Sequence, residues 1–125
     1  MSEDFVSFEI AKKLKEKGFE LRTRYGYIPP IKLIHEAFTD KDWTKINGYA
    51  APTISQVLKW LREEKLILIG LSPMQEYGGD EVVEWCATVY KADKQGGLSW
   101  QEEFYYQSYE QAALAGIEYV LDNLI

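Results

Sequence analysis

Residues 53–71, TISQVLKWLREEKLILIGL, decide the fold class, because a capped amphipathic helix runs there directly into an apolar strand. Thr53 and Gln56 have the spacing of a capping box, which predicts that a helix begins here. Apolar residues recur at helical spacing up to about residue 64, at Ile54, Val57, Leu58 and Leu61. Residues 66–71 are a nearly continuous apolar run, which is typical of a buried central strand. This stretch therefore indicates a domain that mixes helices with a sheet.

Two further helices are predicted near the ends of the sequence. Ser7 can cap a helix over about residues 8–17, which carries one apolar stripe. Ser108 and Gln111 repeat the capping-box spacing ahead of an apolar helix that runs from residue 109 to residue 124.

Two segments between the first two helices favour strands. Residues 19–27 alternate in polarity, which predicts a half-buried strand whose polar side carries Arg22 and Arg24. Residues 31–38 fit either a strand or a helix, and we favour a strand. Residues 39–51 are rich in Asp, Asn and Gly, which predicts a loop.

Downstream, two more alternating segments predict a β-hairpin. Residues 82–91 and 98–107 are its strands, a turn at Gly96 and Gly97 joins them, and Gly78 and Gly79 form an earlier turn. In the first strand, an inward face is predicted to carry Val83, Trp85, Ala87 and Val89, and the opposite face Glu84, Cys86, Thr88 and Tyr90. In the second strand, one face is predicted to carry Trp100, Phe104 and Tyr106, and the other Gln101, Glu103, Tyr105 and Gln107.

The order of these elements predicts an α+β fold. Helices that each offer one apolar stripe and strands that each offer one apolar face bury a shared core when they pack together. We expect a single domain over residues 1–125, with a mainly antiparallel sheet of about four or five strands and about three helices. A chain of 125 residues can bury about two-thirds of its surface, so it needs neither metal nor disulfide to fold.

The net charge of −6 opposes non-specific attraction to nucleic acid or anionic lipid. This charge is unevenly distributed, because residues 1–65 carry 12 basic and 10 acidic side chains, while residues 66–125 carry 2 and 10. The longest apolar run is far short of the ~20 residues that span a bilayer. With one cysteine and no signal-peptide pattern, the expected location is the cytoplasm.

Residue types that carry chemistry do not form a recognisable catalytic pattern. His35 is the only histidine and Cys86 the only cysteine, so neither zinc-ligand spacing nor a thiol–imidazole pair is present. Neighbouring Glu102 and Glu103 point to opposite sides of a strand and cannot share one cleft. We therefore expect no catalytic, cofactor-binding or metal-ligating residues, no cofactor and no enzymatic activity.

The helix at residues 53–64 followed by a strand and a hairpin also fits a winged-helix nucleic-acid-binding module. Phosphate contacts would then come from Arg22, Arg24, Lys59 and Arg62. The hairpin that would form the wing lies in the acidic half, and no helix precedes Thr53 through a short turn. We treat nucleic-acid binding as the alternative, and as the less favoured one.

The aromatic content points instead to a protein partner. The sequence has 18 Phe, Trp and Tyr residues, and Tyr and Trp are enriched at protein interfaces. We expect Trp60, Tyr90 and Tyr105 to lie at the edges or outer faces of their elements. These three are the candidate partner-binding residues, and Arg22 and Arg24 are the candidates for an anionic partner.

Three segments together resemble a family of short, uncharacterised proteins encoded by bacteriophages and prophage-bearing gut bacteria. They are SFEIAKKLKEKGF, APTISQVLKWLREEK and YYQSYEQAALAGIEYVL, in that order. The resemblance implies a small intracellular α+β protein of phage or mobile-element origin, and it implies no activity and no site residues. The function expected from the sequence is that of an accessory protein that binds an unknown protein partner or itself.

Overall fold

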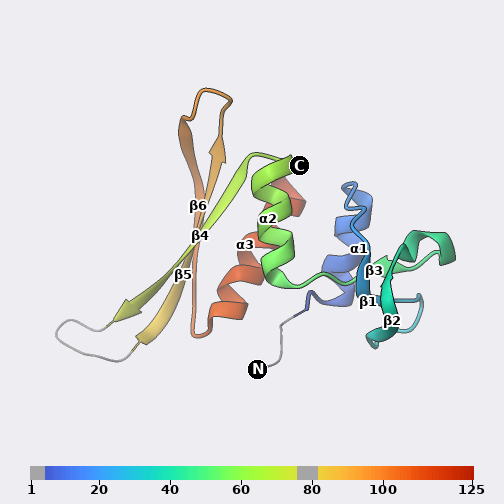
Figure 1. Cartoon of the computed structure of the whole chain (residues 1–125). Coiled ribbons are helices and arrows are strands. Elements are labelled where there is room, and N and C mark those ends of the chain that lie inside the picture. Colours follow the sequence, from blue (N-terminus) through green and yellow to red (C-terminus); the bar gives the residue numbers. More distant parts are fainter. Residues whose placement is uncertain (1–4, 76–81) are drawn as a thin grey trace. The chain divides into compact units, whose positions relative to one another are not determined.

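The computed structural model describes residues 5–75 and 82–125, and it confirms an α+β fold. The strands form two antiparallel sheets of three strands each, whereas the sequence predicts about four or five strands in mainly one sheet (Figure 1). Internal contacts group the chain into two compact units, Met1–Ser55 and Gln56–Ile125, and each contains one of the sheets. The predicted turn at Gly78 and Gly79 lies outside the described residues.

The first unit is built from a helix and a small sheet. Its elements are α1 (Phe8–Glu16), β1 (Thr23–Tyr27), β2 (His35–Lys41), the 3-10 helix η1 (Trp43–Ile46) and β3 (Tyr49–Ala50). The sheet has the order β2-β1-β3. The predicted cap of α1 is present, because the Ser7 side chain accepts a hydrogen bond of 3.3 Å from the backbone N–H of Ile10.

Trp43 organises the core of this unit and explains why residues 39–51 are not simply a loop. The indole is 3% exposed, and its Nε1 donates a hydrogen bond of 2.8 Å to the carbonyl of Thr23. A Cβ at Gly26 would lie 2.3 Å from the ring, so only glycine allows β1 to approach it this closely. One large apolar residue within a polar stretch thus holds η1 and β3 against β1.

The two strands predicted upstream are shorter than expected. β1 begins at Thr23 and not at residue 19, and β2 begins at His35 and not at residue 31. The strand interpretation of residues 31–38 therefore holds only for the second half of that segment. The pair of β1 and β2 is joined by side chains as well, since the Tyr25 hydroxyl donates to the Glu36 carboxylate at 2.6 Å.

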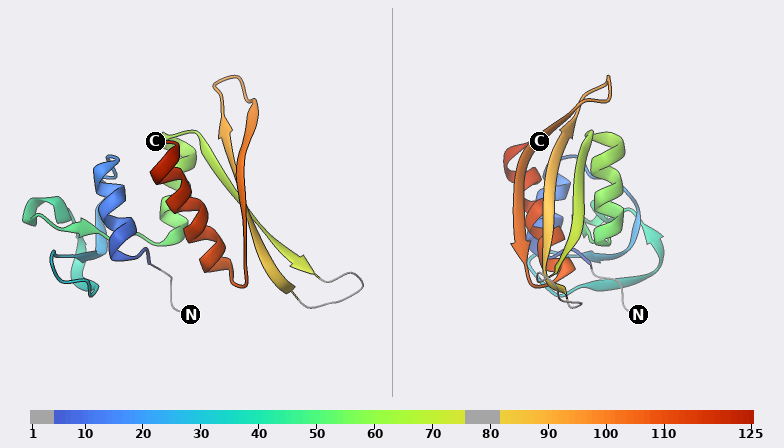
Figure 2. Two further views of the ribbon diagram at one scale, coloured as in Figure 1. Left: turned by 180° about the vertical axis from the view of Figure 1, so that it is seen from behind. Right: turned by 90° about the vertical axis from the view of Figure 1, so that its left-hand side faces the viewer.

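The second unit contains a three-stranded sheet with two helices on one side (Figure 2). Its elements are α2 (Ile54–Glu64), which begins at the end of the first unit, β4 (Ile67–Gln75), β5 (Val82–Ala92), β6 (Leu98–Tyr106) and α3 (Tyr109–Asn123). Ser108 caps α3 as predicted, because its side chain accepts from the backbone N–H of Gln111 at 3.1 Å.

β4 is an edge strand, whereas its apolar run predicts a central one. The sheet order is β4-β5-β6, so β5 occupies the centre. Leu58 and Arg62 of α2 line a shallow hollow together with Leu68 and Ile69 of β4. Part of this apolar run thus adjoins α2 at a position where a second neighbouring strand was expected.

A bulge in β6 decides which aromatic side chains share a face. Val89 pairs with Glu102 but Tyr90 pairs with Trp100, so Gln101 is an extra residue in β6. An insertion of one residue moves all side chains beyond it to the opposite face of a sheet. Trp100 therefore lies on the face of Tyr90 and not, as the alternation predicts, on the face of Phe104.

The helix side of the sheet is closely packed. A Cβ at Gly116 of α3 would lie 3.2 Å from Ile69 and 3.7 Å from Ala87, so this glycine brings α3 close to the sheet. Aromatic pairs extend the contact, since Phe104 and Tyr119 have ring centroids 5.6 Å apart. The buried residues of α3 are Ala112, Ala113, Gly116, Ile117, Val120 and Leu121.

Candidate functional site

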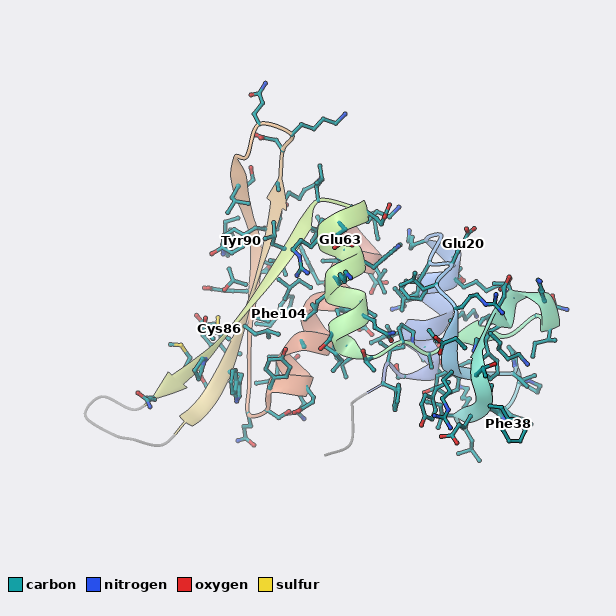
Figure 3. All side chains as sticks on the ribbon, in the orientation of Figure 1. Glu20, Phe38, Glu63, Cys86, Tyr90 and Phe104 are labelled. Atoms are coloured by element: carbon teal, nitrogen blue, oxygen red, sulfur yellow. The ribbon has the colours of Figure 1, made fainter. Side chains whose placement is uncertain are left out.

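The sheet of the second unit has one side that neither α2 nor α3 covers, and we call it the open face. In Figure 3, Tyr90 and Cys86 lie on this side, whereas Phe104 lies on the helix side. The strand register assigns to the open face Leu68, Gly70, Ser72 and Met74 of β4, Glu84, Cys86, Thr88 and Tyr90 of β5, and Leu98, Trp100, Glu103 and Tyr105 of β6.

Three aromatic side chains dominate the open face. Tyr90 and Trp100 are direct cross-strand partners, and Tyr105 stands opposite Cys86. Trp100 is 56% exposed and Tyr105 48% exposed, while Tyr90 at the central strand is half-buried. Exposed apolar residues continue this surface, at Leu98 of β6 and Met74 of β4. The predicted outer-face positions of Tyr90 and Tyr105 are confirmed, and Trp100 joins them.

Tyr105 has an unusual electrostatic setting. The pKa of Tyr105 is raised above its ordinary value of 10.0. The largest causes are hydrogen bonding to Cys86 and the electrostatic interaction with it, followed by repulsion from the Glu103 carboxylate. Cys86 itself is 7% exposed, and its Sγ lies 3.5 Å from the Thr88 hydroxyl oxygen. The Cys86 thiol opposite Tyr105 is therefore a packed side chain of the open face.

Trp60 does not belong to an exposed aromatic surface. It is 8% exposed, and the Nζ of Lys65 lies 5.4 Å from its ring centroid. Trp60 follows the fully buried Val57 by three positions and precedes Leu61 by one, so it belongs to the buried stripe of α2. The helical spacing of Trp60 from Val57 already indicates a buried position, so the prediction of an edge position was wrong.

Arg22 and Arg24 are exposed, as predicted, and belong to the first unit, whereas the open face belongs to the sheet of the second unit. Arg24 is already engaged, because its Nε donates to the Ala37 carbonyl at 3.1 Å and it forms an ion pair of 3.5 Å with Glu36. Arg22 contributes to the lowered pKa of Asp42, whose main cause is hydrogen bonding to Thr44. The two arginines and the two tyrosines thus belong to different units.

A second set of exposed apolar side chains lies in the first unit, and sequence reasoning missed it. Phe38 of β2 is 102% exposed and Leu33 is 75% exposed, and Ile31 and Ile34 are exposed beside them in sequence. Alternation along residues 31–38 suggested a half-buried strand. The only signal for exposure was the Pro29-Pro30 step, which separates this segment from β1.

Chemistry-bearing residues are dispersed over the described part of the chain. His35 lies in β2 and Cys86 in β5, which belong to different sheets. Within residues 5–75 and 82–125, no group of three or more His, Cys, Asp and Glu side chains gathers as metal ligands would. In the same ranges, every helix is too short or too polar to cross a membrane.

Comparisons of the chain with protein-family models, with curated proteins and with solved structures find no match.

Proposed function

We propose that this protein is a non-enzymatic, cytoplasmic accessory protein of phage or mobile-element type that binds another protein through the open face. The observation that carries the proposal is the grouping of Tyr90, Trp100 and Tyr105 on the one side of the sheet that the two helices leave uncovered.

Physical considerations support a protein as the partner. Trp and Tyr dominate the energetics of protein interfaces because they combine a large apolar area with a polar tip. Rigid strands hold these rings, so little conformational entropy is lost when they are covered. Leu68 and Leu98 lie beside the pair of Tyr90 and Trp100, and Thr88 and Glu103 stand between this pair and Tyr105, so the open face combines apolar with polar positions as protein interfaces do.

Nucleic-acid binding has weaker support. The Glu36 carboxylate competes with phosphate for Arg24, and the exposed Lys59 and Arg62 of α2 stand beside Glu63 and Glu64. The second unit carries 5 basic and 12 acidic side chains over residues 56–125, which opposes phosphate contact by its sheet.

The proposal is tested by removing the aromatic rings of the open face without changing strand propensity. Trp100→Thr combined with Tyr105→Thr serves as the test variant, and Phe38→Thr, which removes a fully exposed ring of the first unit, is the control. Immobilised protein is exposed to bacterial lysate, and the oligomeric state is measured by light scattering. We expect the wild type to retain a lysate protein that the double variant does not retain and that the Phe38→Thr control still retains. If the wild type is monomeric and retains nothing that depends on these two rings, the proposal is wrong.

A further inference from the structure

We infer that the outer edge of β6 accepts an extended, basic segment of the partner protein as an additional strand. This inference rests on the proposed function, and it adds which part of the sheet is contacted and what chemistry the partner brings. Four features of β6 carry it: its position, the direction of its backbone groups, its carboxylates and the rings beside them.

The position of β6 leaves its backbone groups available. β6 has nine residues and lies at the edge of the sheet, with β5 as its strand neighbour among the described residues. The Asp93 backbone N–H donates to the Gly97 carbonyl at 2.9 Å, so odd-numbered residues of β5 direct their backbone groups toward β6. The backbone groups of their partners Glu102, Phe104 and Tyr106 point back toward β5. The backbone groups of Glu103 and Tyr105 therefore point outward.

The opposite edge of the sheet carries a protection against such an addition. Ala92 donates to the Leu66 carbonyl at 2.8 Å, so even-numbered residues of β5 point toward β4. Pro73 pairs with the odd-numbered Trp85, which places the nitrogen of Pro73 on the outer side of β4. A proline there has no N–H to offer a new strand, which is a known protection of sheet edges. β6 contains no proline and no basic residue, so this protection is absent from it.

The edge of β6 is instead occupied by one of its own side chains. The outward N–H of Glu103 donates a hydrogen bond of 3.0 Å to the carboxylate of Glu102. A carbonyl of an incoming strand would replace this carboxylate on the same N–H. The displaced carboxylate then requires a new partner, and a lysine or arginine of the incoming strand supplies one through a charge-assisted hydrogen bond.

The open face offers a second place for a cationic side chain. Glu103 lies between Tyr105 and, across the bulge, Trp100 along the exposed side of β6. A carboxylate flanked by aromatic rings attracts a lysine or arginine through both the opposite charge and the ring faces. Glu102 and Glu103 point to opposite sides of the strand, so basic residues on both sides of the incoming strand meet a carboxylate.

The same charges disfavour a second copy of this chain as the occupant. When β6 pairs with itself along its whole length, Glu102 stands opposite Glu102 of the copy. When the copy is shifted by two residues toward the C-terminal end of β6, Glu103 stands opposite Glu103 of the copy. Like charges directly opposite each other destabilise a strand pair. The acidic balance of residues 56–125 adds to this repulsion and favours a basic partner.

The inference is tested with synthetic peptides on the full-length protein. One labelled peptide of about nine residues, the length of β6, alternates lysine with valine, and a matched peptide alternates glutamate with valine. Glu103→Pro is the edge-blocking variant, because the lost N–H points outward and the hydrogen bonds to β5 remain. Glu103→Gln keeps the N–H and removes the charge. Binding is measured by fluorescence anisotropy at low and moderate salt, and circular dichroism checks that each variant is folded.

We expect the lysine peptide to bind the wild type and the glutamate peptide to bind at least about tenfold more weakly. Glu103→Pro lowers the affinity for the lysine peptide about tenfold or more, and Glu103→Gln lowers it severalfold and reduces its salt dependence. Absence of binding by the lysine peptide, equal binding of the two peptides, or equal binding by wild type and a folded Glu103→Pro variant overturns the inference. So does a dimer of the wild type that Glu103→Pro dissociates, because the occupant is then a second copy. If Glu103→Pro retains a captured partner that the ring variant loses, the proposed function stands and this inference falls.

Discussion

Replacing Gly26 with alanine tests the packing that holds the first unit together. The added Cβ would lie 2.3, 2.5 and 2.7 Å from Cδ2, Cε2 and Cε3 of Trp43. Carbon atoms approach one another to about 3.5 Å, so the indole must retreat by about 1 Å. The ring is buried, and its Nε1 is fixed at 2.8 Å from the Thr23 carbonyl, so it has little room to move.

The expected destabilisation follows from these contacts. Overpacking of a core costs about 1–3 kcal/mol, and weakening the hydrogen bond of the indole adds about 0.5–1.5 kcal/mol. Gly26→Ala should therefore lower the free energy of unfolding of the first unit by about 2–4 kcal/mol. Urea unfolding followed by fluorescence and circular dichroism gives the free energy, and hydrogen exchange with mass spectrometry locates the loss in residues 5–55.

Gly70→Ala is the matched control, because Gly70 also lies in a strand but a Cβ there meets no atom within 4 Å. Alanine is favoured over glycine inside a strand by about 0.5–1 kcal/mol, so this variant should be neutral or slightly more stable. If both substitutions change the free energy of unfolding by the same amount, the argument that Trp43 requires glycine in β1 is refuted.

Three further predictions concern the second unit. Phe104→Ala should destabilise the protein by about 2–4 kcal/mol and Trp100→Ala by about 1 kcal/mol, because the bulge leaves only the first ring on the packed side; equal losses in urea unfolding would contradict the register. Tyr105 should ionise above its ordinary pKa and Cys86→Ala should lower that pKa, because the thiol is the main cause of the shift. Near-ultraviolet absorbance titration measures this pKa, and Tyr105→Phe identifies the signal. Because the pKa is higher in the folded state, the contribution to stability is fully present below the ordinary pKa of 10.0 and is lost as the pH rises through the raised pKa. Ser108→Ala should lower the free energy of unfolding by about 1 kcal/mol through loss of the cap of α3, and an unchanged urea midpoint would count against the cap.

Local signals in the sequence predicted the helices well. Ser7 and Ser108 accept the hydrogen bonds expected of helix caps, because capping depends on residues only three positions apart. The hairpin strands were likewise found from their alternation and from the turn at Gly96, which has a φ of 88°.

Non-local features were beyond the reach of sequence patterns. The division of the strands into two sheets depends on pairings that no local pattern specifies. One example is the pairing of Tyr27 with Tyr49, which β2 and η1 separate in the sequence. The place of Trp100 depends on the bulge at Gln101, and an extra residue in one strand has no signature in the polarity pattern. For the candidate site, alternation therefore identified Tyr90 and Tyr105 and missed the third ring.

The proline in β4 has a consequence for stoichiometry. A sheet with two equally receptive edges can add strands on both sides and grow into a filament of unlimited length. Here the nitrogen of Pro73 occupies the outward side of one edge, so a segment added at the other edge ends the growth. Assembly through this sheet is therefore self-terminating, with one partner segment for each molecule.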